Sequence, residues 1–65
     1  MENTTITRVK KFRIDSSYTQ TEMANILKVA QPTLARLEKR GIRKVDTAKR
    51  YAEILKTNPL TLLEI

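Results

Sequence analysis

The amino-acid sequence predicts an all-α fold, a compact bundle of about five short helices, from three observations. The 65 residues include only one Gly and two Pro, the residues that most often interrupt helices. Ala, Leu, Lys, Arg and Glu, which favour helices, are abundant. Apolar residues recur at the spacing of one helix face. This length predicts a single domain over residues 1–65, whose small core buries only about 60% of the surface of the unfolded chain.

The first helix is expected over roughly residues 4–15. Three apolar residues lie three positions apart in this segment and predict its buried face: Ile6, Val9 and Phe12. The basic residues between them should then point mostly outward: Arg8, Lys11 and Arg13.

The clearest helix start is Thr19. Glu22 follows Thr19 by three residues and predicts a capping box, in which each side chain binds a free backbone amide of the first turn. Tyr18 and Met23 flank the cap as a hydrophobic staple. The apolar spacing then predicts a short helix over about residues 20–27, followed by a tight turn at residues 28–30.

A second helix is predicted to open at Gln31 and Pro32, because Pro is tolerated in the first turn of a helix. Leu34 and Leu37 mark its buried face. Gly41, the only glycine, stands where a left-handed residue would end the helix. Two short helices joined by three turn residues predict a helix-turn-helix over about residues 20–40.

Two further helices are predicted after Gly41. One apolar face of the first contains Val45, Ala48, Tyr51, Ala52 and Leu55. Asn58 and Pro59 form a cap and first-turn pair that starts a short last helix. These apolar residues, Tyr51 included, are interpreted as core. Only three residues are aromatic, which argues against binding single strands by stacking.

The charge is strongly basic. Thirteen Lys and Arg against seven Asp and Glu leave a net charge of +6, and the isoelectric point is about 10.1. The basic residues cluster at positions 8–13 and 36–50. A pI above about 9 is typical of nucleic-acid-binding domains. From charge alone, an anionic membrane surface and an acidic protein partner remain alternatives.

Several classes of protein are excluded. The absence of Cys and His removes disulfides and the common zinc and iron sites, so no metal and no cofactor is expected. The carboxylates are scattered singly and there is no glycine-rich phosphate loop, so we expect no enzyme. No apolar run is long enough for a signal peptide or a membrane span.

Residues 19–38, with the sequence TQTEMANILKVAQPTLARLE, resemble the helix-turn-helix of the phage-repressor and Cro-like, or lambda-repressor-like, family. That family has a T-Q-x-E-L-A opening and a G-V-S-Q-x-x-I-S-R-x-E run. The matching positions are Gln20, Ala24, Val29, Gln31, Leu34, Leu37 and Glu38. Lys28 replaces a usual Gly and Ala30 a usual Ser or Thr cap, each at a cost of about 1 kcal/mol.

The resemblance implies a sequence-specific, double-stranded DNA-binding transcriptional regulator, Cro-like or a minimal repressor, acting in the cytoplasm of a bacterial or phage-infected cell. With Leu34 and Leu37 buried, the outward face of the second motif helix would enter the major groove. Gln and Arg can bind adenine and guanine edges there. The base-reading candidates are Gln31 and Arg36, then Ala35, Thr33 and Pro32.

A second group is expected to bind DNA phosphates: Gln20, Lys39, Arg40, Arg43 and Lys44. Gln20 stands in the first turn of a helix, whose N-terminus favours anions. The resemblance also implies that Gln20 braces Gln31. Arg36 and Lys39 could exchange roles, because the sequence does not define the rotation of the helix.

Members of this family commonly bind inverted repeats as two-fold dimers, with half-sites about 34 Å apart. The last six residues contain four large apolar side chains, more than one face of a short helix can bury: Leu60, Leu62, Leu63 and Ile65. Leu62 is expected to be exposed. We expect Leu60, Leu62 and Ile65 to form a weak homodimer contact, formed or strengthened on DNA. The alternative is a frayed tail with Leu60 and Leu63 in the core.

Two other functions remain open. An antitoxin-type module that also represses its own operon would use the same fold, because a fold does not define a function. A basic peptide for membranes or RNA is disfavoured, since the basic residues interleave with a core pattern. No small-molecule ligand and no membrane association is expected.

Overall fold

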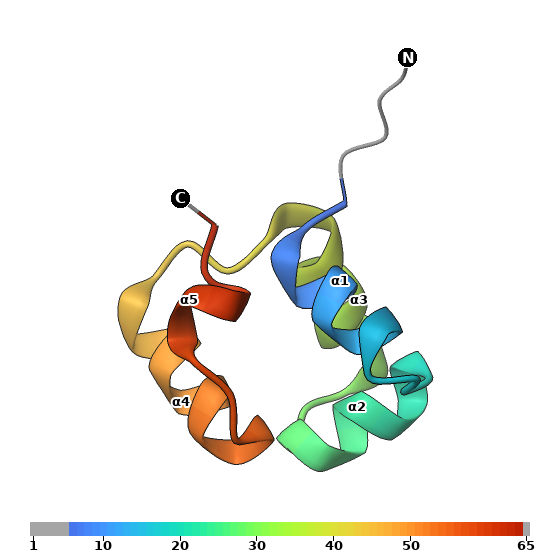
Figure 1. The fold of residues 1–65 in the computed structure, drawn as a ribbon. Coiled ribbons are helices and arrows are strands. Elements are labelled where there is room, and N and C mark those ends of the chain that lie inside the picture. Colours follow the sequence, from blue (N-terminus) through green and yellow to red (C-terminus); the bar gives the residue numbers. More distant parts are fainter. Residues whose placement is uncertain (1–5, 65) are drawn as a thin grey trace.

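The computed structural model describes residues 6–64 and has five helices in that range (Figure 1). They are α1 (Arg8–Asp15), α2 (Gln20–Leu27), α3 (Gln31–Arg40), α4 (Val45–Leu55) and α5 (Pro59–Leu62). One isolated parallel β-bridge joins Ile42 to Leu63. The prediction of an all-α bundle of short helices is confirmed, and the boundaries of the two motif helices agree with the sequence signals.

Capping side chains mark the first turns of α1, α2 and α5. The Glu22 amide donates to Thr19 Oγ1 at 3.1 Å and the Thr19 amide donates to Glu22 Oε1 at 2.8 Å, which completes the predicted capping box. Asn58 Oδ1 accepts from the Leu60 amide at 2.8 Å, as predicted for α5. The first helix is shorter than expected, because Thr7 caps it and Ile6 lies before it, 41% exposed. Residues 4 and 5 of the expected helix lie outside the described residues.

The motif turn contains one residue with a left-handed backbone. Lys28 adopts the left-handed conformation, with φ 60° and ψ 42°, where Gly would be free of strain. Ala30 precedes α3 without a side-chain cap hydrogen bond. Gly41 ends α3 with the expected positive φ of 86°, but its ψ of 161° leads into extended chain rather than a left-handed cap.

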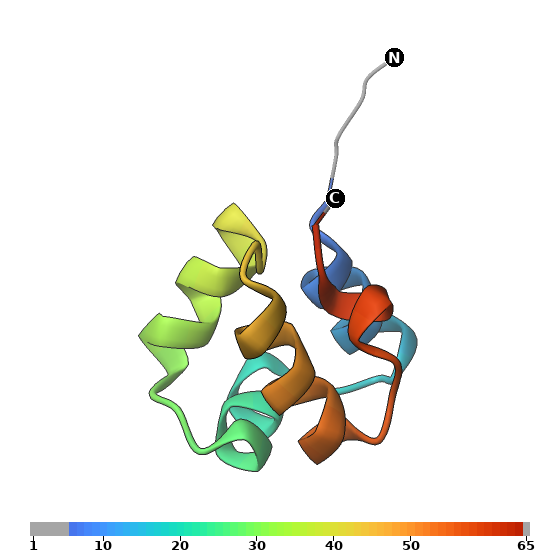
Figure 2. The same ribbon diagram turned by 90° about the vertical axis from the view of Figure 1, so that its left-hand side faces the viewer.

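The five helices share one apolar core, and each of them contributes to it. Its buried members are Val9, Met23, Ala24, Leu27, Leu34, Ile42, Ala48, Tyr51, Ala52 and Leu62. Helix α3 packs against α1 and α2, while α4 packs against α2 and α5 (Figures 1 and 2). Tyr51 is a core residue, as predicted. The packing holds α3 from its inner side and leaves its outer side free for a partner.

Two residues, Leu62 and Val45, do not have the exposure that we expected. Leu62 is fully buried in the core, whereas Leu60 is 56% exposed. Two residues apart on a helix correspond to nearly opposite faces, so docking α5 through Leu62 turns Leu60 outward. Val45, predicted as core, is 52% exposed because it is the first residue of α4, ahead of the part that packs on the core. Ile65 lies outside the described residues.

Candidate nucleic-acid interface

The outward face of α3 is polar and basic, and the helix lies along one side of the molecule (Figure 2). Its exposed residues are Gln31, Pro32, Thr33, Arg36, Lys39 and Arg40. Leu34 is buried, as predicted, and Leu37 and Ala35 are half-buried. Six of the seven α3 residues proposed from the sequence to contact DNA are therefore exposed, and Ala35 lies at the edge of the face.

The basic surface continues past the end of α3. Arg43 and Lys44 are exposed in the turn between α3 and α4. A shallow groove of about 300 Å³ lies here, lined by Leu37, Arg40, Gly41, Ile42, Arg43, Lys44 and Thr47. The ion pairs between described residues lie elsewhere, at Lys11–Asp15 and Arg13–Glu38. This end of the surface is therefore suited to anions.

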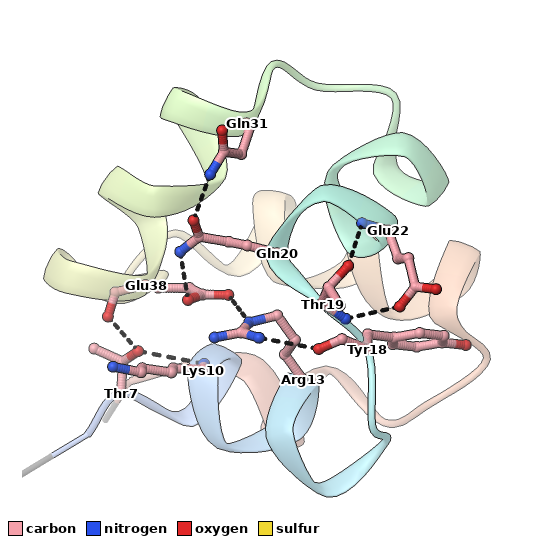
Figure 3. A network of polar contacts seen from close by, with 9 residues as sticks. All are labelled: Thr7, Lys10, Arg13, Tyr18, Thr19, Gln20, Glu22, Gln31 and Glu38. Atoms are coloured by element: carbon pink, nitrogen blue, oxygen red, sulfur yellow. Dashed lines mark hydrogen bonds and ion pairs between the residues drawn. The ribbon is translucent and has the colours of Figure 1, made fainter.

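A chain of hydrogen bonds supports the start of α3 from behind (Figure 3). Gln31 Nε2 donates to Gln20 Oε1 at 2.8 Å. Gln20 Nε2 donates to Glu38 Oε1 at 3.1 Å. The other carboxylate oxygen of Glu38 accepts from Arg13 Nε at 2.5 Å. The structure thus contains the contact between Gln20 and Gln31 that the resemblance implied, and it extends that contact to α1.

The carboxylate of Glu38 determines which atoms donate and which accept in this series of hydrogen bonds. An ionised carboxylate only accepts hydrogen bonds, so Gln20 must turn its amide nitrogen toward Glu38. The carbonyl oxygen of Gln20 then accepts from Gln31. This leaves Gln31 with its own carbonyl oxygen and a second N–H, the donor and acceptor pair that an adenine edge requires. The exposed Gln31 is therefore held in one orientation.

Arg13 and Glu38 form a buried pair that the sequence did not predict. Arg13 was expected to point outward, but its side chain is 16% exposed and that of Glu38 is 3% exposed. Arg13 Nη1 also donates to the Tyr18 carbonyl at 3.0 Å, which ties α1 to the segment before α2. The sequence does contain a signal for this pair. Glu38 follows the buried Leu34 by four positions, so both lie on one helix face. A carboxylate buried there needs a cationic partner.

The far end of α3 is also tied to α1. The Thr7 hydroxyl donates to the backbone carbonyl of Glu38 at 2.6 Å and accepts from the Lys10 amide at 3.4 Å. One of the last carbonyls of α3, which lack partners inside the helix, is thereby satisfied by the residue that caps α1. Helix α3 is therefore held at Glu38 by α1 and its cap, and at Gln31 by Gln20 of α2.

A family model described as helix-turn-helix matches residues 9–62, most of the chain. The chain belongs to this helix-turn-helix family. It is a DNA-binding transcription regulator of the Cro type, with the lambda-repressor-like fold. The family is a DNA-binding one rather than a family of enzymes. No match was found among curated proteins or among solved structures.

In this helix-turn-helix protein, α2 and α3 are the motif helices, and the matched range includes all of α2 to α5 and all but the first residue of α1. Within residues 6–64, no helix is long and apolar enough to cross a membrane. The same residues contain no cluster of acidic side chains that could hold a metal ion.

Proposed function

We propose that this protein is a sequence-specific, Cro-like or minimal repressor, which inserts α3 into the major groove as a homodimer on an inverted repeat. The observation that carries the proposal is the orientation of Gln31 by Gln20, Glu38 and Arg13. Fixing an exposed amide with a partly buried network has no evident role in folding alone. It is suited to reading a base, because recognition groups must be held in place by supporting residues.

The proposed base contacts lie along the outward face of α3. Gln31 binds adenine through its free carbonyl oxygen and N–H, and Arg36 binds guanine with two parallel hydrogen bonds. Arg36 is exposed and follows Gln31 by five residues, about 1.4 turns of the helix. The remaining contacts are Pro32 and Thr33 at the start of the helix and the Ala35 methyl, which suits the methyl group of thymine.

The proposed phosphate contacts surround this face: Gln20, Lys39, Arg40, Arg43 and Lys44. They position the duplex without reading its sequence. The second N–H of Gln20 Nε2 remains for a phosphate after the bond to Glu38. Arg40, Arg43 and Lys44 line the same groove at the end of α3, which supports a shared role in binding the DNA backbone.

The proposed dimer contact uses Leu60 rather than Leu62. Leu60 is the most exposed large apolar residue among those described, at 56%, whereas Leu62 packs in the core of its own protomer. The association is expected to be weak and strengthened by DNA, because an interface centred on one leucine buries little apolar area. The whole chain acts as one DNA-binding domain, and we place it in the cytoplasm of a bacterial or phage-infected cell.

Selection of binding sequences from random double-stranded DNA at about 150 mM salt tests the function, since ionic strength near that of the cell weakens purely electrostatic binding. We expect an enriched inverted repeat with half-site centres about ten base pairs apart. Binding that collapses with rising salt and enriches no sequence would contradict the proposal. A protein partner, as in an antitoxin, would then become the leading alternative.

Arg36→Ala is expected to weaken binding to the selected site by about 1–3 kcal/mol and to relax preference at one base pair. The matched control is Arg43→Ala, which removes the same side chain from the turn after α3. It should weaken binding to all duplexes alike and lower the salt slope by about one unit. Titrations on the selected and a scrambled duplex measure both effects. An equal loss for Arg36→Ala on every duplex would assign Arg36 to a phosphate.

A further inference from the structure

The segment after α5 returns to the end of the DNA-reading helix. Leu63 forms a parallel β-bridge with Ile42, and the Glu64 amide donates to the Ile42 carbonyl at 2.8 Å. Ile42 is buried and follows Gly41, the residue at which α3 ends. Residues distant in sequence are therefore joined directly behind the C-terminal end of α3.

The Glu64 side chain extends this contact to α1. Its Oε2 accepts from the Arg8 amide at 2.5 Å. Arg8 is the first residue of α1, and the first amides of a helix have no acceptor inside it. A carboxylate also interacts favourably with the positive end of the helix dipole. The Arg8 guanidinium donates in turn to the Leu60 carbonyl at 3.2 Å. Glu64 thus joins the start of α1 to the end of α5.

Gly41 provides the space for this carboxylate. A Cβ placed on Gly41 would lie 2.4 Å from Glu64 Cγ, closer than any real contact of that kind, and the φ of 86° is itself unfavourable for other residues. The chain uses its only glycine where the Glu64 side chain crosses the end of α3. We call Thr7, Arg8, Gly41, Ile42 and Glu64 the Glu64 junction.

The Glu64 junction lies at the C-terminal end of α3, and the hydrogen bond between Gln31 and Gln20 lies at its N-terminal end. Thr7, which caps α1 beside Arg8, also binds the Glu38 carbonyl in the last turns of α3. Gln20 holds the first residue of α3. The tilt of a short helix in the major groove depends on both of its ends, and a recognition site tolerates errors of only about 0.5 Å.

We propose that Glu64 is a positioning residue for DNA reading, which sets the C-terminal end of α3 without touching DNA. This inference rests on the proposed function of α3. The direction of the expected change in DNA binding distinguishes this positioning role from a simple effect of the Glu64 charge. Glu64 is an acidic residue in a chain of net charge +6, so removing its charge should strengthen contacts to DNA in general. Loss of positioning should instead weaken the preference for the correct sequence.

Hydrogen exchange of the free protein tests the structural part and needs no DNA. The variants are Glu64→Ala, Glu64→Gln, which keeps an acceptor for the Arg8 amide, and Glu53→Ala, a matched control on the exposed side of α4. The Gly41 amide donates to the Leu37 carbonyl at the end of α3. In Glu64→Ala, the hydrogen-exchange rate of this amide should rise about tenfold more than the rate of the Met23 amide in α2. A uniform rise across the chain would overturn the proposal, because it would indicate only a loss of global stability.

DNA titration of the same variants tests the functional part. We expect the ratio of affinities for the selected and a random duplex to fall about tenfold in Glu64→Ala, to stay within about threefold in Glu64→Gln and to remain unchanged in Glu53→Ala. Equal ratios for Glu64→Ala and Glu53→Ala would overturn the positioning role. A wild-type protein without any sequence preference would instead contradict the proposed function, while the exchange experiment would still test the junction.

Discussion

Arg13→Ala is expected to lower the free energy of unfolding by about 3 kcal/mol, because it leaves a buried carboxylate without its cation. The Glu38 side chain is 3% exposed and its Oε2 lies 2.5 Å from Arg13 Nε. Gln20 alone would remain as a side-chain partner of that carboxylate. For a domain of this length the loss would be a large part of the total stability, which is of order 0.1 kcal/mol per residue. Urea unfolding followed by circular dichroism measures it.

The matched control for Arg13→Ala lies on the same helix. Lys11 pairs with Asp15 at 2.9 Å, but these side chains are 65% and 61% exposed. Lys11→Ala should therefore change the free energy of unfolding by less than about 0.5 kcal/mol. Replacing both members of the buried pair, as Arg13→Met with Glu38→Leu, should recover much of the stability. Similar losses for Arg13→Ala and Lys11→Ala would contradict a buried role for Arg13.

Leu62→Ala is expected to lower the free energy of unfolding by about 3 kcal/mol or more, through lost burial and the cavity left behind. Leu62 is fully buried although it belongs to a helix of four residues. Its removal would leave α5 without its only buried side chain. Urea unfolding of the variant beside the wild type measures the loss.

Leu60→Ala is the control, two residues away on the opposite side of α5. Leu60 is 56% exposed, so the variant should unfold within about 0.5 kcal/mol of the wild type. Its expected defect is in association, seen by analytical ultracentrifugation with and without the selected DNA. An unchanged dimer fraction on DNA would remove Leu60 from the proposed interface. A stable Leu62→Ala variant would contradict the packing of α5.

Some features of the candidate site could be predicted from the sequence, and others could not. The position of Arg36 on the outward face of α3 follows from helical spacing once Leu34, two residues before it, is assigned to the core. The pairing of Arg13 with Glu38 joins positions 25 residues apart, and no local pattern indicates which of several basic residues supplies the cation. The contact of Glu64 with Arg8 spans 56 residues and depends on how α5 folds back.

Local sequence signals are sufficient for those elements that depend on neighbouring residues. Thr19 with Glu22 and Pro32 define the motif helices, because capping and first-turn chemistry act within one helical turn. Which side of a short helix is buried depends instead on how that helix packs in the folded protein. Leu60 and Leu62 are chemically identical, and their opposite environments arise because α5 docks on α1 and α4. Burial is a property of the assembled core, to which each helix contributes one face, and so no single segment specifies it.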